Sequence, residues 1–443
     1  MPPVEGGVVA VTGASGFIGS WVVLELLRAG YEVRALVRDA SNEAKTAHLL
    51  TKARELGKEA ALRFFSGDLS QAGDYDEAFS GADAVVHTAA VVAIRAKDPL
   101  RDIVEPSIIG TQNVLASADR SKTVKRIIHT SSVAAIQSYD KKTDYIFTER
   151  DEATWSTIAR GDPYGYAKLS AERLVREAGL ASPLYDTVSI NPVVVFGPCL
   201  TKAHTKASPS FLRQFLYGNK APDAWVSVVD VRDVAAAHVV ALNKVECAGQ
   251  RYIIGAYRRT ANERVLRAKL KLCQTNRNHR PCLFVLPANA AEDSSAGRLS
   301  TLGDNVVAAC PDLLVRPRFI PGWQVTVAFH WPWLLGATAL GLLGGGVATL
   351  SGGTQTVLGA TLTGLGVVGL GMATMMRPKP YVQKVFSTEV RFSAEKSRRE
   401  LGLQYRELHE TLRDTALSMV EPGWVKVQRR EGGEKQPLKS SSL

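Results

Sequence analysis

The 443-residue sequence predicts an α/β protein whose core is a doubly wound parallel sheet, and three features of residues 7–255 support that prediction. Short apolar runs alternate with amphipathic helical patterns, the runs are apolar throughout, and a glycine-spaced turn joins the first run to the first helix. Strands that are covered by helices on both faces can be apolar at every position. The expected strands are VVAVTG, EVRALVR, RFFSGDL, AVVHTAA, RIIHTSSV, TVSINPVVV and RYIIG.

The composition is that of an ordinary globular protein, with 45% hydrophobic and 22% charged residues. The formal charge of +11 favours anionic partners such as cofactor phosphates or lipid headgroups. The five cysteines lack the paired spacing of a zinc site, so we expect no bound metal. The N-terminus lacks the basic and apolar regions of a cleaved signal peptide, and we expect none.

The turn after the first strand, VTGASGFIGSWVV, has the glycine spacing of a dinucleotide-binding loop. Gly13, Gly16 and Gly19 permit a tight turn, close approach of the backbone to a pyrophosphate, and close packing of the next helix. The free N–H groups in the first turn of that helix suit an anion, and the helix should end at Gly30. We therefore predict a Rossmann-type domain whose further cofactor contacts in this loop are Ser15, Phe17 and Ile18.

The end of the second strand, ALVRDASNEAK, distinguishes the two nicotinamide cofactors. This position normally carries an acid that binds a free ribose hydroxyl or a base that binds a 2'-phosphate. Arg38 occupies it and Lys45 follows one short connection later, so we predict NADPH in preference to NADH. Asp39, an acid next to Arg38, favours NADH instead. At the end of the third strand we expect contacts to the adenine from Asp68, which can accept from the amino group, and from Leu69.

Tyr164 and Lys168 lie four residues apart in DPYGYAKLSAERLV and therefore share one face of a helix. A phenol has a pKa of about 10, so it needs nearby positive charge to exchange a proton at neutral pH, and Lys168 can supply it. Lowering that pKa by about three units requires roughly 4 kcal/mol of stabilisation. The fifth strand ends in three hydroxyls at the ligand-binding edge of the sheet. We expect one of them to bind a substrate carbonyl, and expect Thr130 and Ser131 to satisfy loop backbone groups.

These motifs resemble the extended short-chain dehydrogenase/reductase superfamily, in the branch of dihydroflavonol reductases, cinnamoyl-CoA reductases and 3-beta-hydroxysteroid dehydrogenases. The similar segments, in order, are VTGASGFIGS, VRALVRDASNEAKTAHL, FFSGDL, VVHTAA, GTQNVL, HTSSVAA, PYGYAKLSAE, SINPVVVFGP and VSVVDVRDVAAAHVVAL. The resemblance implies that Ser132 binds the carbonyl, Tyr164 donates the proton, and Lys168 tunes Tyr164 and binds the nicotinamide ribose. It also implies cofactor contacts at Thr88, Ala89, Ala90, Pro192, Val193, Val195 and Ser210.

One departure from this branch concerns the substrate. Dihydroflavonol reductases hold the flavonoid with an asparagine shortly after the serine, whereas the corresponding position here is Gln137. A flavonoid substrate is therefore not predicted.

The chain divides into five predicted parts, of which residues 1–255 form the NAD(P)-binding domain with the catalytic residues. Residues 256–328 are a basic, irregular connector, 329–380 an apolar segment, 381–425 the C-terminal part of the substrate-binding region, and 426–443 a disordered tail. The basic stretch 258–280 suits either anionic headgroups or a solvated helix. It lacks interleaved aromatic residues, so we expect no nucleic-acid partner.

The apolar segment is long enough to cross a membrane twice. Residues 319–376 contain no charged side chain, and one span takes about 20 helical residues. We predict a two-helix hairpin within 331–376, because flanks that belong to one domain exclude an odd number of crossings. Basic residues on both sides, among them Arg318 and Arg377, agree with both ends facing the cytosol. The alternative is a poorly ordered insert, since the many glycines weaken both helices.

We therefore predict an NADPH-dependent carbonyl reductase that transfers hydride to an apolar aldehyde, ketone or sterol-like substrate. It would lie on the cytosolic face of an intracellular membrane such as the endoplasmic reticulum, or otherwise in the cytoplasm. Two alternatives stay open: an NAD-linked 3-beta-hydroxysteroid or sterol dehydrogenase, and a non-catalytic nucleotide-binding regulatory protein. The predicted partner is a small apolar carbonyl or hydroxyl compound. The sequence leaves the oligomeric state open, a homodimer included.

Overall fold

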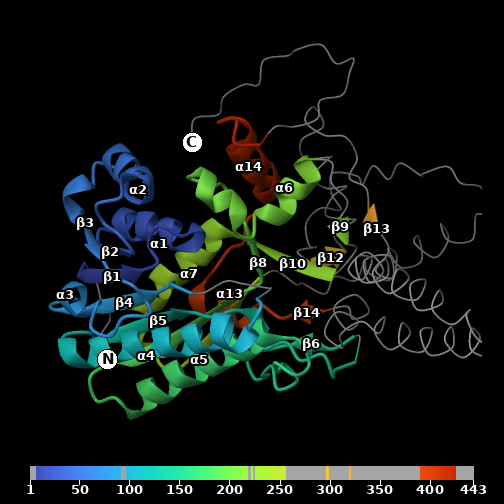
Figure 1. The fold of residues 1–443 in the computed structure, drawn as a ribbon, viewed down its shortest axis with the longest axis horizontal. Coiled ribbons are helices and arrows are strands. Elements are labelled where there is room, and N and C mark those ends of the chain that lie inside the picture. Colours follow the sequence, from blue (N-terminus) through green and yellow to red (C-terminus); the bar gives the residue numbers. More distant parts are fainter. Residues whose placement is uncertain are drawn as a thin grey trace, which may run out of the picture.

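The computed structural model describes residues 6–90, 96–142, 144–217, 221–222, 225–255, 296–298, 319–320 and 390–425. Its centre is a seven-stranded parallel sheet with the order β11-β7-β5-β4-β1-β2-β3, which confirms the predicted doubly wound fold (Figure 1). The order reverses between β1 and β4, where such sheets bind ligands. The strands are β1 (Val8–Thr12), β2 (Glu32–Val37), β3 (Leu62–Ser66), β4 (Ala84–His87), β5 (Arg126–Thr130), β7 (Asp186–Pro192) and β11 (Arg251–Ile254).

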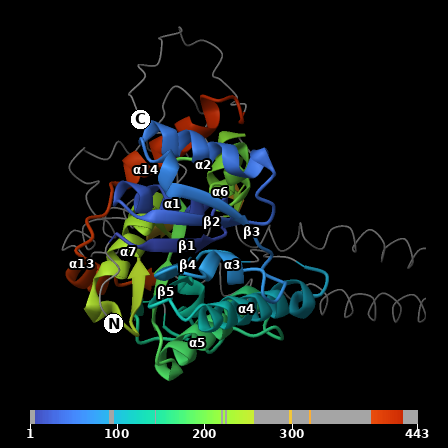
Figure 2. The ribbon, with the colours of Figure 1, turned by 90° about the vertical axis from the view of Figure 1, so that its left-hand side faces the viewer.

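Helices cover both faces of this sheet, as the two perpendicular views in Figures 1 and 2 show. Successive side chains of one strand point to opposite faces, so Val9 and Val11 belong to one buried cluster and Ala10 to the other. This two-sided burial is the physical reason why the strands are apolar throughout. One face carries α1 (Phe17–Arg28), α2 (Glu43–Glu55) and α7 (Val231–Asn243), and the other carries α3 (Asp76–Phe79), α4 (Glu105–Ser121) and α5 (Pro163–Ala181).

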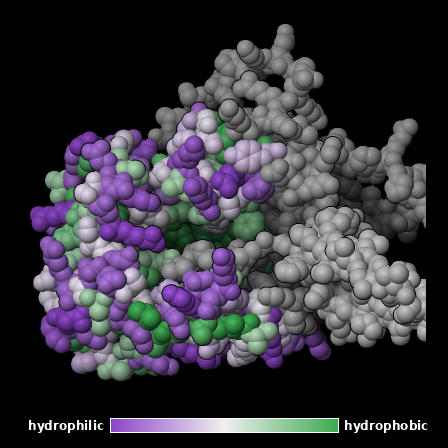
Figure 3. All heavy atoms as spheres, in the orientation of Figure 1, coloured by the Kyte–Doolittle hydropathy of each residue, from purple (hydrophilic) through white to green (hydrophobic). Residues whose placement is uncertain are grey.

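Smaller elements lie beyond the carboxyl ends of the strands. A three-stranded sheet has the order β12-β10-β8, and β14 pairs with β6 in parallel. Figure 3 shows that this face of the molecule is hollowed between the α1/α2 half and the α4/α5 half, with a hydrophobic floor. The elements are β6 (Ile146–Phe147), β8 (Val194–Phe196), β10 (Trp225–Asp230), β12 (Ala296–Arg298), β14 (Arg391–Phe392), α6 (Ser210–Leu216), α13 (Glu395–Leu401) and α14 (Leu408–Val420), with β9 (Ala221–Pro222) paired to β13 (Phe319–Ile320).

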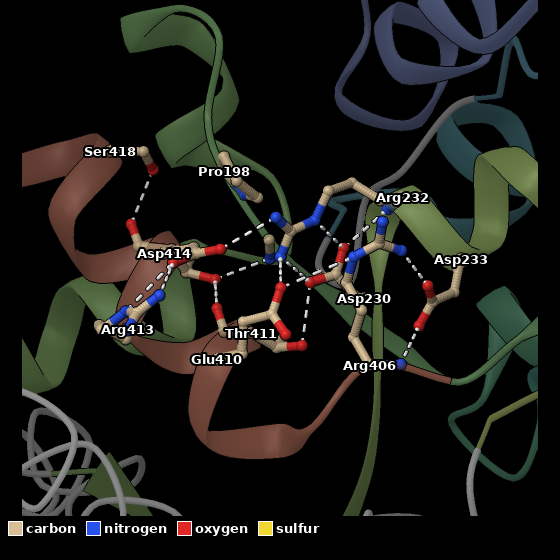
Figure 4. A network of polar contacts seen from close by, with 12 residues as sticks. Pro198, Asp230, Arg232, Asp233, Arg406, Glu410, Thr411, Arg413, Asp414 and Ser418 are labelled. Atoms are coloured by element: carbon tan, nitrogen blue, oxygen red, sulfur yellow. Dashed lines mark hydrogen bonds and ion pairs between the residues drawn. The ribbon is translucent and has the colours of Figure 1, made fainter. Parts of the chain in front are cut away.

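A network of charged side chains fastens the C-terminal segment to the body of the protein (Figure 4). Asp230, which caps α7, is buried and binds Arg232 at 2.7 Å and the hydroxyl of Thr411 in α14 at 2.9 Å. Arg232 also pairs with Asp414 at 2.9 Å. Removing one partner from such a buried group leaves an uncompensated charge, so these contacts strongly favour the docked position of α14.

The predicted membrane hairpin at 329–380 lies outside the described residues, as do the tail 426–443 and most of the connector 256–328. Within the part of the chain that the structure describes, no helix is both long and apolar enough to cross a bilayer. The hairpin therefore stays a prediction.

Candidate functional site

The glycine-rich loop lies where the strand order reverses, between the carboxyl ends of β1 and β4. Gly13 has a φ of +68°, and a Cβ atom there would lie 2.8 Å from the backbone of Ala89. A Cβ atom at Gly19 would lie 2.3 Å from the carbonyl oxygen of Gly13. Two of the three predicted glycines are thus required by the turn and by close packing, because any side chain at either position would collide with backbone.

The N-terminus of α1 is suited to an anion. Among the described residues no side chain caps this helix, and its first turn contains no acidic residue. Gly16 at the N-cap is exposed, so no side chain of its own obstructs the N–H groups of the first turn. These free donors, at the positive end of the helix dipole, fit a pyrophosphate.

The other predicted loop residues contribute differently. The Ser15 carbonyl accepts from His204 Nε2 at 3.2 Å, and the ring of Phe17 is buried and packs edge-on against the His204 ring, with the ring centroids 5.7 Å apart. Phe17 can therefore offer a cofactor its backbone but not its side chain. Ile18 is half-buried.

Arg38 and Lys45 are both exposed, at the end of β2 and in the first turn of α2. Asp39, which argued for NADH, uses one carboxylate oxygen to accept from the Ser41 backbone N–H at 3.0 Å and from its hydroxyl at 2.6 Å. These hydrogen bonds lower the pKa of Asp39 and hold its side chain against the turn in which it lies. The local geometry therefore favours the basic pair as the ligand-facing groups of this edge.

The two predicted adenine contacts follow β3. Hydrogen bonds from the backbone and hydroxyl of Ser70 lower the pKa of Asp68, with a smaller contribution from Arg38. Both bonds reach the same oxygen of Asp68, at 2.8 and 2.7 Å. Leu69 packs against α4, because a Cβ atom at Gly110 would lie 2.1 Å from its Cγ.

The predicted contacts at the end of β4 are tied to β1. The Thr88 hydroxyl donates to the Thr12 carbonyl at 2.7 Å, and the Ala89 N–H donates to the Thr12 hydroxyl at 3.3 Å. Ala90 is exposed and precedes residues 91–95, which lie outside the described ranges. The structure thus brings the loop and the β4 end together as one surface.

Ser132 lies close enough to the Tyr164 phenol to act on its pKa, and Lys168 follows Tyr164 by one turn of α5. The Lys168 ammonium is buried and donates to the Thr130 carbonyl at 3.2 Å. Burial raises the pKa of the half-buried Tyr164 phenol, Asp162 raises it further, and the Ser132 hydrogen bond opposes both. Burial lowers the pKa of Lys168 to about 8, against an opposing effect of Glu172. The three residues predicted as catalytic therefore meet at one place.

The remaining predicted contacts lie on the far side of β7. Pro192 ends β7, and the side chains of Val193 and Val195 are buried in the main core. Their neighbour Ser210 begins α6 and is half-buried. Val193 and Val195 could therefore contact a ligand only through their backbone groups or through the exposed edge of a side chain.

Sequence reasoning was wrong about Thr130 and Ser131. The Thr130 hydroxyl pairs with His238 Nε2 at 2.8 Å, and the Ser131 hydroxyl donates to Glu172, so both bind side chains rather than loop backbone. Glu172 was missed, although its position four residues after Lys168 on the same helix was a signal for it. No comparable signal marked His238, since its partner is more than a hundred residues away.

Two further histidines lie beneath this site at the ends of β4 and β5. The rings of His87 and His129 stack with centroids 5.3 Å apart, and both are buried. Neither ring nitrogen of His129 has a hydrogen-bond partner within the described part of the chain. Among those same described residues, no group of three or more side chains is placed to hold a metal ion.

Comparison with known proteins places these features in context. A family model described as the NAD dependent epimerase/dehydratase family matches residues 9–255. Cinnamoyl-CoA reductase CAD2 of Medicago truncatula is 34% identical over 257 residues, covering 56% of this chain and 76% of that protein. Dihydroflavonol 4-reductase of Arabidopsis thaliana is 33% identical over 262 residues, covering 56% of this chain and 65% of that protein.

Solved structures share the fold. Gre2 of Candida albicans, solved in complex with NADPH, has a TM-score of 0.64 at 21% identity, covering 94% of this chain and 99% of that one. Vestitone reductase from alfalfa, Medicago sativa, has a TM-score of 0.59 at 19% identity, covering 94% and 99%.

Proposed function

Because the chain belongs to the NAD-dependent epimerase/dehydratase family, in the dihydroflavonol and cinnamoyl-CoA reductase branch of the extended short-chain dehydrogenases/reductases, we propose that this oxidoreductase uses NADPH to reduce an apolar aldehyde or ketone, with Tyr164 as the proton donor. One observation carries the proposal: Ser132 acts on the Tyr164 phenol, and Lys168, one turn further along α5, donates to the Thr130 carbonyl two residues before Ser132, at the edge of the sheet that also holds the glycine loop.

The cofactor site supports NADPH on this chain's own geometry. The uncapped first turn of α1 would hold the pyrophosphate, Arg38 and Lys45 the 2'-phosphate, and Lys168 the nicotinamide ribose. When bound, the cofactor supplies the hydride. Gre2 of Candida albicans, a structural relative solved with NADPH, agrees with this choice.

The resting protonation of Tyr164 suits the proton donor of a carbonyl reduction. Burial raises the pKa of the phenol, so it rests with its proton at neutral pH, which is the form that a proton donor needs. Ser132 is placed to hydrogen-bond the carbonyl oxygen that receives this proton. As the oxygen takes the proton, the Lys168 ammonium stabilises the phenolate that forms.

A panel of apolar aldehydes, ketones and sterol-like carbonyls tests the function. We expect NADPH oxidation, followed at 340 nm, with at least one class of substrate, and an alcohol product in equal amount. The hydrophobic floor of the hollow in Figure 3 is the reason to weight the panel towards apolar compounds. Failure with the whole panel would contradict the proposal.

Arg38→Ala should weaken NADPH binding by about 10- to 100-fold, the value of one or two charge-assisted hydrogen bonds to a phosphate. NADH, which lacks that phosphate, should bind almost unchanged. Dissociation constants from nicotinamide fluorescence would measure both. Lys58→Ala, an exposed cation beyond the end of α2, is the control and should alter neither constant. Equal losses for the two nucleotides would contradict the assignment of Arg38.

We also propose that residues 331–376 insert in a membrane as a hairpin. In support, residues on both sides of 256–389 belong to one folded unit, because β14 pairs with β6 and Lys396 of α13 donates to the Arg251 carbonyl at 3.1 Å. An inserted segment between them must therefore cross an even number of times. The full chain should stay in the pellet on carbonate extraction of cell membranes, and a variant with 331–376 replaced by a Gly/Ser linker should not. Release of both would contradict insertion.

A further inference from the structure

Glu172 lies behind the catalytic residues and takes no part in the proposed reaction as described so far. It follows Lys168 by one helical turn and Tyr164 by two, so the three residues share one face of α5. Its side chain is only 1% exposed. A carboxylate this deeply buried is costly unless each oxygen has a partner.

Both oxygens of Glu172 interact with residues outside α5. One accepts from Asn191 Nδ2 at 2.6 Å and from the Ser131 hydroxyl. The other forms an ion pair with Arg251 and has no hydrogen-bond partner among the described residues. Asn191 Nδ2 also donates to the Ser132 carbonyl at 3.1 Å. The network therefore connects Glu172 to the backbone of the residue that contacts the Tyr164 phenol.

Arg251 is fixed in turn by backbone groups. Its NH1 donates to the carbonyl of Glu149 at 3.2 Å and to that of Asp151 at 2.9 Å. It is itself nearly buried, and it begins β11, whereas Asn191 lies in β7. Three strands and one helix thus converge on one carboxylate.

Several titratable groups lie around Lys168. Its charge acts on His87, which ends β4, and on His129 in β5. His238 of α7 pairs with the hydroxyl of Thr130, whose carbonyl accepts from Lys168, and Tyr164 and Glu172 lie on α5 itself. Burial lowers the pKa of His87 to about 3 and that of His238 to about 4, and it holds that of His129 well below its ordinary value. The histidines are therefore neutral near pH 7, and among the described residues Glu172 supplies the negative charge that acts on Lys168.

We propose that Glu172 is a positioning residue of the reaction: its buried charge keeps Lys168 cationic, and its hydrogen bonds through Asn191 and Ser131 hold the strand end that carries Ser132. This inference rests on the proposed reductase function. Without the charge, Lys168 would lose its proton at a lower pH. A neutral lysine cannot stabilise the phenolate that forms on Tyr164, so turnover would fall.

Glu172→Gln tests the inference, because it removes the charge and keeps the shape. In the wild-type enzyme the alkaline limb of kcat should follow Lys168, near pH 8. In the variant that limb should move down by about one pH unit, the usual size of the effect of one nearby charge. Glu172→Asp, which keeps the charge, should return the limb most of the way. An unmoved limb in Glu172→Gln would overturn the proposal.

Two further variants separate charge from folding. Asp186→Asn removes another largely buried carboxylate that pairs with a buried arginine, Arg126, at the opposite end of the sheet. It should lower Tm without moving the limb. The double variant Glu172→Gln/Arg251→Met removes both ends of the buried pair, so it should recover much of the Tm lost in Glu172→Gln. Its limb should lie between those of Glu172→Gln and wild type, because loss of the Arg251 cation raises the pKa of Lys168. A limb lower than that of Glu172→Gln would overturn the proposal.

An NMR titration tests the same inference without turnover. With carbon-13 at the lysine ε position, and the Lys168 signal assigned by its absence in Lys168→Arg, the midpoint should be lower in Glu172→Gln than in wild type. Equal midpoints would overturn the inference. A wild-type protein that shows no turnover but does show this difference would instead refute the reductase function alone.

Discussion

Tyr164→Phe should lower kcat for carbonyl reduction by about 10²- to 10⁴-fold, the usual contribution of one positioned proton donor. The change removes only the Tyr164 hydroxyl, so the substrate oxygen would keep the Ser132 hydrogen bond but lose its proton donor. The half-buried ring keeps its packing, and the glycine loop and Arg38 are untouched. NADPH affinity and Tm should therefore stay close to wild type, as nucleotide titration and thermal unfolding would measure.

Tyr166→Phe is the matched control. Tyr166 lies two residues further along α5, is exposed, and faces away from the Ser132 side of the helix. Its loss should leave kcat and KM unchanged. If Tyr164→Phe and wild type reduced the best substrate at equal rates, the assignment of the proton donor would be wrong.

The protein should lose stability steeply as the pH falls from 6.5 towards 4. Five histidines, four of them buried and His48 half-buried, have pKa values below the ordinary 6.5, in each case chiefly because burial disfavours the charged ring. The folded state therefore binds fewer protons than the unfolded state in this range, and acid favours unfolding. The contribution of these neutral histidines to the free energy of unfolding is fully present above pH 6.5, and it is lost as the pH falls below that value. The five are His48, His87, His129, His204 and His238.

The expected slope follows from the number of protons taken up. Each histidine contributes about 1.4 kcal/mol per pH unit once its unfolded form is protonated. Asp233, Glu149 and Asp162 act in the opposite direction, because burial raises their pKa values, that of Asp233 to about 6, and their folded forms bind a proton first. The histidines outnumber these carboxyl groups, so the net effect is still a loss of stability, on the order of a few kcal/mol per pH unit near pH 5.

Urea unfolding at pH 7.5, 6.5, 5.5 and 5.0 would measure this loss. His129→Phe is the informative variant, because it replaces a ring that stacks on His87 and has no hydrogen-bond partner in the described part of the chain. Its slope should be shallower by about 1.4 kcal/mol per pH unit. A free energy of unfolding that stays flat between pH 6.5 and 5.0 would show that these rings are not buried neutral.

The sheet could be predicted from the sequence because its strands have a simple pattern. Val9, Ala10 and Val11 are all apolar since the two faces bury alternate residues, and no other common arrangement favours that pattern so strongly. The predicted end of α1 at Gly30 is confirmed by its φ of +90°. Tyr164 and Lys168 could be paired because helical spacing alone brings them to one face.

The groups behind the site could not be predicted in the same way. Glu172 acquires its role from Asn191 and Arg251, which reach it from two other strands, and nothing local to any of the three indicates that meeting. The same holds for Thr130 and His238, whose pairing depends on how α7 packs under β5. Long-range polar contacts of this kind depend on three-dimensional packing, which spacing in the chain does not encode.

Titration of the purified protein with NADPH tests the central claim most directly, since it needs no knowledge of the substrate. We predict saturable binding of one nucleotide per chain, with enhanced nicotinamide fluorescence, competition by NADP⁺, and weakening by Arg38→Ala. A folded protein that binds neither NADPH nor NADH at millimolar concentration would contradict the account.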